Sequence, residues 1–202
     1  MEVIRMFTDR ELLENLRSQK KLNESIQFIY RNYFELFEIP IQLKVDKTTL
    51  KNRFFELSRK YHPDYFANAD PEEKSDSLEK SAMLNKAWKT FQDCDETIKY
   101  VLQSKNLLEE EEKYQLPAPF LMEMMDINEQ LADAKFEEDL KLIGNLQLAI
   151  GNLESQIYEP VKDIVEHYRE GITTEKELLQ VKEYYYKKKY LKRIRQQLKG
   201  NT

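Results

Sequence analysis

The chain has 202 residues, of which 41% are hydrophobic and 34% are charged, and its formal net charge is −5. Only four glycines and six prolines are present, too few for the many turns of a hairpin-rich β fold, so we expect an all-α protein. A net negative charge provides no overall attraction to nucleic acid or to an anionic membrane, and the single cysteine excludes an internal disulfide.

The N-terminal segment indicates where the protein is located in the cell. It contains Glu2, Asp9, Glu11 and Glu14, unlike a signal peptide or an acid-poor transit peptide. No apolar run approaches the roughly 20 residues that span a membrane. We therefore expect a cytoplasmic protein without a membrane partner, in which residues 1–31 form an N-terminal extension of unknown role.

The first predicted helices follow this extension. The stretch NYFELFEIP indicates a short aromatic helix that ends near Pro40. A second helix is capped by Asp46 or Thr48. Its apolar residues are spaced 4, 3 and 4 apart along one stripe; they are Leu50, Phe54, Leu57 and Tyr61. Pro63 ends this helix, because proline disfavours α geometry in the residue before it.

A third helix begins with the sequence DPEE. Asp70 is a suitable N-cap, Pro71 takes the first helical position, and Glu73 completes a capping box. This helix runs to about Phe91. Two antiparallel helices then place the tripeptide His62-Pro63-Asp64 at the exposed tip of a hairpin.

The remaining chain is also predicted to be helical. A helix over 95–108 is followed by EEEEKYQLPAP, whose like charges and prolines are typical of a linker. Three further helical stretches cover roughly 119–134, 137–169 and 173–199, with a bend near Pro160 and a break near Gly171. Three helices with short connections favour an antiparallel bundle.

The His62-Pro63-Asp64 corner has several interpretations. Histidine and aspartate are common acid–base partners, but no nucleophile accompanies them. A metal site lacks ligands, because the second histidine is far away in the sequence and there is one cysteine. Taken alone, the tripeptide is most simply a turn that ends a helix. We therefore expect a protein that is not an enzyme, with no catalytic residue, no metal and no cofactor.

In its context, the corner resembles a known module. The aromatic helix, the basic helix leading into KYHPDYF, and the following helix with LNKAWKTF closely resemble the J-domain of DnaJ-type co-chaperones. The resemblance implies that the corner engages a DnaK-class ATPase chaperone and stimulates its ATP hydrolysis. Pro63 would fix the turn, Asp64 would accept a charge-assisted hydrogen bond, and His62 would supply a compact polar ring.

Basic residues on the helix before the corner are further candidates for chaperone binding. They lie away from the apolar stripe and would face an acidic chaperone surface; they are Lys47, Lys51, Arg59 and Lys60. The alternative is an ordinary solvated helix face.

The second half of the chain narrows the resemblance. The stretch PAPFLMEMMDINEQLADA closely resembles the start of the C-terminal bundle of the HscB family, J-type co-chaperones of iron–sulfur cluster assembly. The likeness runs from about residue 32 to 199. It implies an L-shaped, all-α protein with a J-domain over 32–110, a linker over 111–118 and a C-terminal bundle over 119–202. The implied partners are the scaffold protein IscU and an HscA- or DnaK-class ATPase.

Helical periodicity separates two faces in the first bundle helix. At about 100° per residue, one set of apolar residues falls within about 60° and faces the core; the set is Phe120, Met124, Ile127 and Leu131. The opposite side is apolar as well and continues into carboxylates. The resemblance assigns scaffold binding to this side: Leu121, Met122, Met125, Asp126, Glu129 and Asp133. The alternative is that these apolar side chains pack beneath the J-domain or the linker.

The last helix is expected to add an aromatic residue to this surface. KKKYLKRI matches the family pattern at Tyr190, with Tyr186 as the second choice, while Tyr184, Leu191, Ile194 and Leu198 would form its core stripe. The basic run KKKYLKRIR is a weak indication of nucleic-acid binding, because the chain is acidic and shows no recognition fold. The alternative function is a general DnaJ-like co-chaperone for unfolded clients.

Overall fold

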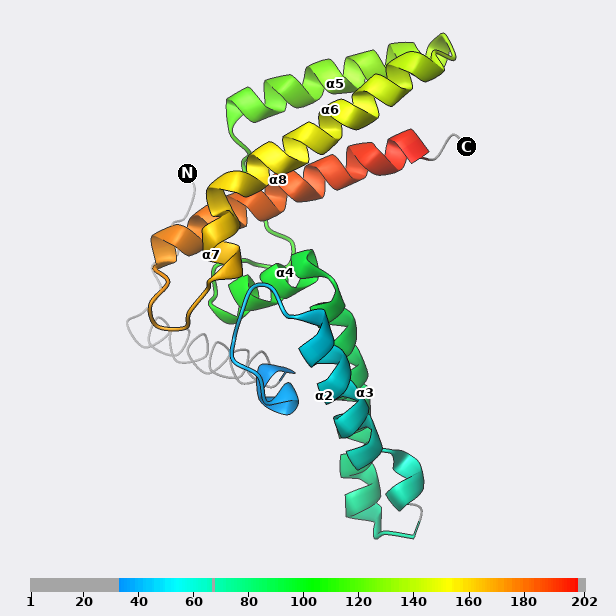
Figure 1. The fold of residues 1–202 in the computed structure, drawn as a ribbon, viewed down its shortest axis with the longest axis vertical. Helices are drawn as coiled ribbons and strands as arrows, with labels where there is room; N and C mark the ends of the chain where they lie inside the picture. Colours follow the sequence, from blue (N-terminus) through cyan, green and yellow to red (C-terminus); the bar gives the residue numbers. More distant parts are fainter. Residues whose placement is uncertain (1–32, 67, 200–202) are drawn as a thin grey trace, which may run out of the picture.

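The computed structural model describes residues 33–66 and 68–199, which form helices and loops and contain no strand. Residues 33–37 are helical. The helices that follow are α2 (Lys47–Lys60), η1 (Pro63–Phe66), α3 (Pro71–Gln92), α4 (Cys94–Ser104), α5 (Ala118–Phe136), α6 (Leu140–Tyr158), η2 (Glu159–Val161), α7 (Lys162–Glu166) and α8 (Glu175–Lys199) (Figure 1). The predicted extension at residues 1–31 lies outside the described residues.

The predicted caps of α2 and α3 are confirmed. Asp46 accepts a hydrogen bond from the Thr49 amide at 2.7 Å, so it is Asp46 that caps α2. Asp70 accepts from the Glu73 amide at 2.8 Å, with Pro71 at the start of α3. These side chains satisfy amide groups that have no partner within the first helical turn. The start of each hairpin helix is therefore set by local sequence.

Several helices end on a non-glycine residue with positive φ. Asn106 has φ 56°, and the Leu107 amide donates to the Leu102 carbonyl at 2.9 Å, which closes a Schellman motif. The predicted helix over 95–108 is consequently too long, since α4 ends at Ser104. Glu138, with φ 54°, ends α5 in the same way. Asparagine and glutamate thus take the left-handed conformation at these helix ends, where glycine is the usual residue.

The bend predicted near Pro160 is confirmed. α6 ends at Tyr158 and passes through the 3₁₀ turn η2 into the short α7. The break predicted near Gly171 is also present, since Gly171 has φ 76° in the loop between α7 and α8.

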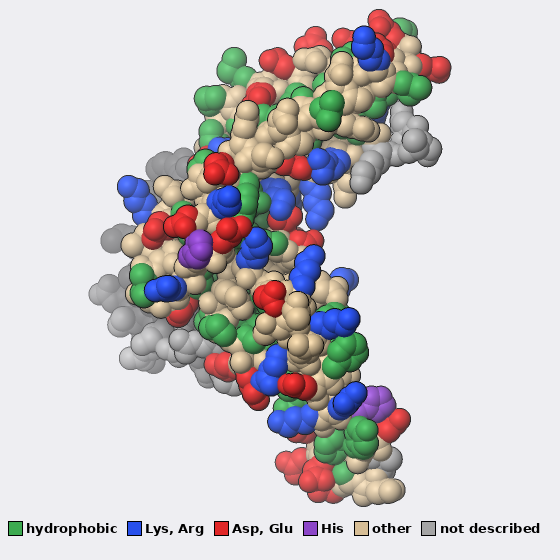
Figure 2. Space-filling model, in the orientation of Figure 1, with side chains coloured by type: hydrophobic (Ala, Val, Ile, Leu, Met, Phe, Trp, Pro, Cys, Tyr) green, Lys and Arg blue, Asp and Glu red, His purple; other side chains and the backbone are tan. Residues whose placement is uncertain are grey.

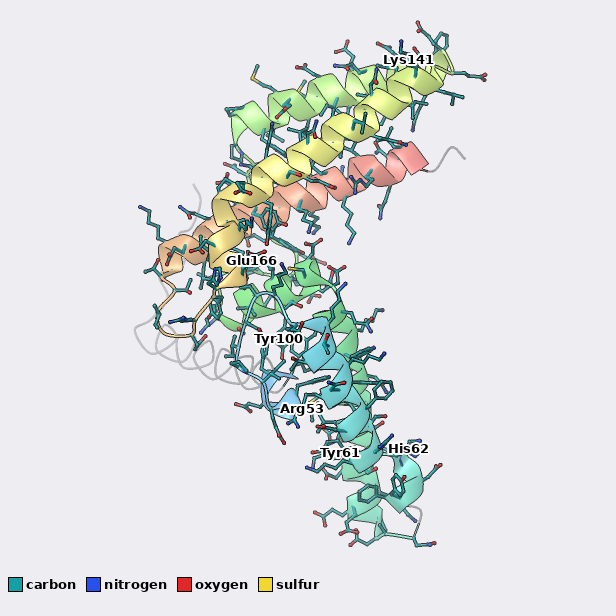
Figure 3. All side chains as sticks on the ribbon, viewed as in Figure 1. Arg53, Tyr61, His62, Tyr100, Lys141 and Glu166 are labelled. Atoms are coloured by element: carbon teal, nitrogen blue, oxygen red, sulfur yellow. The ribbon has the colours of Figure 1, made fainter. Side chains whose placement is uncertain are left out.

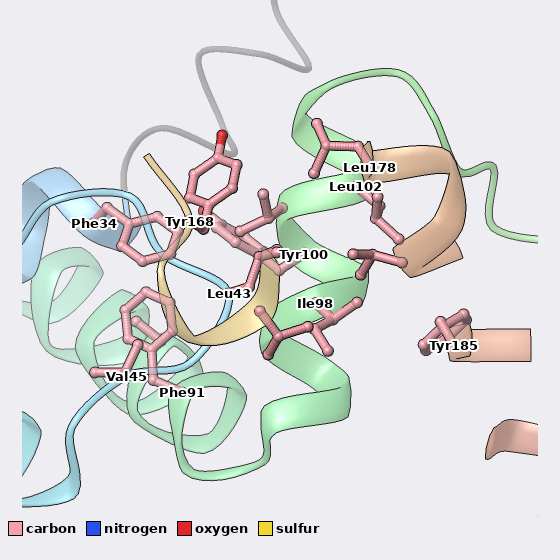
Figure 4. Close-up of a cluster of buried hydrophobic side chains, with 14 of the residues drawn as sticks. Phe34, Leu43, Val45, Phe91, Ile98, Tyr100, Leu102, Tyr168, Leu178 and Tyr185 are labelled. Atoms are coloured by element: carbon pink, nitrogen blue, oxygen red, sulfur yellow. The ribbon is translucent and has the colours of Figure 1, made fainter. Parts of the chain in front are cut away.

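One buried core joins the α2–α4 region to distant parts of the chain. Aromatic rings of the 33–37 helix and α3 pack together, with the Phe34 and Phe91 centroids 4.6 Å apart. The same cluster includes residues of η2, of α7 and the loop after it, and of the first half of α8, namely Val161, Val165, Tyr168, Leu178, Val181, Tyr184 and Tyr185 (Figure 4). The hairpin region is therefore completed by side chains far along the sequence.

A second buried core lies inside the bundle of α5, α6 and α8. Its members include Phe120, Met124, Ile150, Leu191 and Ile194. The stripe predicted along α8 is buried throughout, but its members divide between the two cores: Tyr184 belongs to the first, and Leu191 and Ile194 belong to the second. One helix thus contributes to both cores.

These packing relationships produce a bent, L-shaped molecule. The α2–α3 hairpin forms one arm, the α5–α6–α8 bundle forms the other, and α4 packs on α8 where they meet (Figure 1). Within the described ranges, no helix has the length and apolar character needed to cross a membrane.

Candidate functional sites on the two arms

The His62-Pro63-Asp64 corner is built by the end of α2. Tyr61 closes that helix, and its amide donates to the Leu57 carbonyl at 2.9 Å. Pro63 then starts the 3₁₀ helix η1, in which the Tyr65 amide donates to the His62 carbonyl at 3.0 Å. Ser77 of α3 donates to the Tyr61 carbonyl at 3.4 Å. The turn is thus held at the tip of the hairpin by backbone hydrogen bonds and by the Ser77 hydroxyl (Figure 3).

The polar groups of the corner remain accessible. His62 and Asp64 are both exposed. The Asp64 amide donates to Nδ1 of His62 at 3.3 Å. With Nδ1 accepting, the neutral ring holds its hydrogen on Nε2, which is left to donate outward. The Asp64 carboxylate lies 3.6 Å from the same Nδ1 and keeps acceptor capacity toward solvent. The corner therefore offers one donor and one anionic acceptor.

The three basic residues predicted beside the corner are all exposed but do not share one face. At about 100° per residue, Lys51 and Arg59 lie within about 80° of each other on α2, whereas Lys60 lies roughly 100° or more from both. Lys60 instead sits 5.2 Å from the centroid of the Tyr61 ring. Only Lys51 and Arg59 therefore flank the side of α2 that leads to His62.

Arg53 shows why not every cation of α2 is available to a partner. Its guanidinium donates to the Phe37 carbonyl at 3.0 Å and to Glu56 at 2.9 Å, and it also pairs with Glu38 (Figure 3). These bonds tie the 33–37 helix to α2. The hydrogen bonds to Glu38 and Glu56 raise the pKa of Arg53 above its ordinary value. Arg53 is therefore a structural residue.

The predicted two faces of α5 are present. Phe120, Met124, Ile127 and Leu131 are buried in the bundle core. Leu121, Met122 and Met125 are 38%, 67% and 68% exposed. The alternative placement of these three side chains beneath the J-domain or the linker is thus inconsistent with their exposure. Exposed methionines form a deformable apolar surface.

Carboxylates extend this apolar surface along α5. Asp126, Glu129 and Asp133 are all exposed, and among the described residues none of the three takes part in an ion pair of the kind seen elsewhere on the bundle, such as Arg195 with Glu154. Figure 2 shows acidic side chains along the upper edge of the molecule, where α5 lies. We refer to the six residues from Leu121 to Asp133 named above as the α5 patch.

Comparison with known proteins identifies the family. Residues 116–199 match the family model for the HSCB C-terminal oligomerisation domain. The protein named co-chaperone protein HscB homolog of Shewanella pealeana is 35% identical over 75% of this chain and 80% of its own length. This chain belongs to the HscB family of co-chaperones.

Other HscB proteins are also similar to this chain. The homolog of Vibrio cholerae serotype O1 (strain M66-2) is 36% identical, and the match spans 50% of this chain and 59% of that protein. The crystal structure of the human co-chaperone HscB superimposes with a TM-score of 0.68 and 26% identity, covering 83% of this chain and 80% of the human one. The HscB structure from Vibrio cholerae, at 22% identity and a TM-score of 0.64, supports the fold.

In this HscB-family chain, the two candidate tyrosines of α8 have different surroundings. Tyr190 packs edge-on against Phe120, with ring centroids 6.1 Å apart, and so reaches the start of α5. Tyr186 stacks on Tyr114 of the linker at 4.5 Å and donates to Glu112 at 3.4 Å. Tyr186 is therefore engaged in contacts with residues 112 and 114, whereas Tyr190 lies beside Phe120, the residue before Leu121.

The arrangement of potential metal ligands and the state of the cysteine thiol bear on catalysis. Nowhere in residues 33–66 and 68–199 do three or more histidine, cysteine or acidic side chains gather as metal ligands would. Cys94 is mostly enclosed, its Sγ lies 3.6 Å from the Leu43 carbonyl, and burial raises the pKa of its thiol. A raised pKa leaves less of the reactive thiolate at neutral pH.

Two exposed aromatic residues near the corner were not among the predicted site residues. Phe55 and Tyr65 are 54% and 75% exposed. Phe55 falls between members of the apolar stripe of α2, about 100° from Phe54, and this off-stripe position is the signal that a sequence offers. Tyr65 directly follows the corner and shows no periodicity.

Proposed function

We propose that this HscB-family chain is a cytoplasmic regulator, and not an enzyme, of iron–sulfur cluster biogenesis. Its bundle binds an IscU-type scaffold through the α5 patch, and its hairpin delivers that scaffold to an HscA- or DnaK-class ATPase. The corner stimulates ATP hydrolysis by that chaperone. The observation that supports this most is the placement of two accessible surfaces of different chemistry on the two arms.

The corner suits a contact that is polar and fixed in shape. Pro63 restricts the backbone of the turn, and the Asp64 carboxylate is free to accept from an arginine or amide of the chaperone. Lys51 and Arg59 flank the contact, while Lys60 carries its charge on another side of α2; exposed charges of this kind affect the rate of association more than the affinity. The nucleotide chemistry takes place on the partner.

The α5 patch suits an interface with an apolar centre and a charged edge. Leu121, Met122 and Met125 provide the centre. Tyr190 lies at the border of this centre, because its ring packs against Phe120, the residue before Leu121. The carboxylates of Asp126, Glu129 and Asp133 favour a scaffold surface with basic residues along one side. Interfaces of this kind depend on a few central anchors within a polar rim.

The deciding experiment uses His62→Gln in the full chain. We expect this variant to lose stimulation of a purified HscA- or DnaK-class ATPase while its thermal melt and its binding to purified IscU stay within error. The reason is that the His62 side chain is 50% exposed at the tip of the hairpin. Normal stimulation by this variant would refute the assignment of the corner, and strong binding of denatured proteins would favour a general co-chaperone instead.

A further inference from the structure

An aromatic residue lies in the middle of the charged side of α2. Lys51, Phe55 and Arg59 follow one another at intervals of four residues, so they form a continuous row that leads to His62. Phe55 is 54% exposed, although residues at positions 50, 54, 57 and 61 already provide the stripe of this helix that packs on the core, two of them buried and two partly buried. Phe55 therefore lies outside the stripe through which α2 packs on the rest of the hairpin.

A second aromatic residue reaches the same place from η1. Tyr65 is 75% exposed, and its ring lies edge-on to His62 with centroids 6.1 Å apart. Between these elements is a shallow groove of about 300 Å³, lined by Phe55, Ser58, Arg59, His62, Asp64 and Tyr65. The two aromatic rings thus border the groove that contains both charged and polar groups of the corner.

We propose that Phe55 and Tyr65 are apolar anchors for the ATPase chaperone, and that the groove between them receives an apolar side chain of that partner. The inference rests on the proposed function, because it assumes that the corner contacts the chaperone. A single exposed apolar residue needs no explanation. Here two such residues from different elements meet at one groove, and that groove includes His62 and Asp64 themselves.

The charges around the groove define the partner further. Arg59 and Asp64 line it on different elements, so the entering apolar side chain is flanked by a carboxylate facing Arg59 and by a cation or amide facing Asp64. Tyrosine and arginine, which line this groove as Tyr65 and Arg59, are among the residues most often found as binding hot spots. Binding is then less sensitive to salt than a purely basic surface would be, since apolar contact is not screened.

The test measures ATPase stimulation of a purified DnaK-class chaperone against the concentration of full-length variants. Phe55→Ala is expected to raise the half-maximal concentration about tenfold or more, and Tyr65→Ala several-fold, while Phe55→Leu stays within about threefold of wild type. The matched control is Phe136→Ala, because Phe136 is 91% exposed but lies on the bundle arm. We expect this control to behave as wild type.

The outcomes separate this inference from the proposed function. If His62→Gln abolishes stimulation but Phe55→Ala and Tyr65→Ala stay within twofold of wild type, the anchors are rejected and the corner stands. If His62→Gln stimulates normally, the proposed function fails, and the inference fails with it. Thermal melts are recorded for each variant. Should Phe55→Ala not fold, Tyr65→Ala decides alone, because Tyr65 lies outside both buried cores.

Discussion

Lys188 of α8 and Asp95 of α4 form a close ion pair, with 2.5 Å between Nζ and Oδ1. Asp95 Oδ1 is enclosed and has no aligned hydrogen-bond donor, so charge is its main compensation. Burial alone would lower the pKa of Lys188, but the Asp95 carboxylate outweighs burial and raises the pKa above its ordinary value of 10.5. This pair joins the two arms at their meeting point.

Replacing Lys188 with methionine is expected to lower the free energy of unfolding by about 1–3 kcal/mol, because a largely enclosed carboxylate is left without its partner. The measurement is urea denaturation near neutral pH. The double variant Lys188→Met, Asp95→Asn should recover part of the loss, since the buried charge is then gone. No recovery would mean that the lysine acts through its aliphatic stem.

Lys192→Met provides the matched control. The distance from Lys192 Nζ to Asp93 Oδ2 is 3.7 Å, and both side chains are about half exposed. An exposed pair of this kind contributes about 0–1 kcal/mol. A loss as large as that of Lys188→Met would show that the whole basic face of α8 stabilises the junction.

The α5 patch gives a second prediction. The triple change of Leu121, Met122 and Met125 to alanine should weaken binding to purified IscU strongly, since central apolar anchors commonly cost about 2 kcal/mol or more each, without being additive. Its thermal stability should hardly change, because exposed side chains leave no cavity. A titration and a melt test both parts, and normal binding would rule out the patch.

Met124→Ala is the internal control for this prediction. Met124 is fully buried on the other side of the same helix. Truncation of a buried methionine typically costs about 2–5 kcal/mol, including the cavity left behind. We therefore expect a lower melting temperature with unchanged affinity for IscU, measured on the folded fraction.

The two tyrosines of α8 should separate in function. Tyr190→Ala removes the ring beside Phe120, and we expect about a 5- to 30-fold loss of IscU affinity. Tyr186→Ala removes the stack on Tyr114 and should lower stability while leaving IscU binding intact. The reverse pattern would assign Tyr186 to the scaffold surface. Calorimetric titration of both variants distinguishes these results.

Glu112 gives a prediction on pH. Burial acts to raise the pKa of its carboxyl, but the Lys182 ammonium at 2.6 Å and a backbone hydrogen bond from Glu109 lower it below the ordinary 4.5. Because the pKa of Glu112 is lower in the folded state than in the unfolded state, the ionised carboxylate stabilises the protein at pH values above the ordinary pKa. This stabilisation is lost as the pH falls through the lowered pKa of the folded state. Glu112→Gln should therefore be less stable than wild type at about pH 7 and closer to it at about pH 4. An equal difference at both values would contradict the ion pair.

Local signals determined most of what could be predicted from the sequence. The caps at Asp46 and Asp70 and the turn at Pro63 depend on adjacent residues, and the exposed face of α5 follows from helical period. The end of α4 was missed because Asn106 takes positive φ without glycine. The division of α8 between two cores was missed because periodicity shows which face of a helix is buried but not the partner it packs against.

The 25-residue α8 also limits how this protein can be rearranged. Many multidomain proteins consist of domains that each have their own core, so these domains can be exchanged by joining chains at the linker between them. A cut at residues 111–118 would separate Leu178, Val181, Tyr184 and Tyr185 from the core that they complete, so both fragments would present apolar surface to water. The hairpin and bundle are consequently a poor pair for recombination, and a functional chimera needs its junction within α8 as well.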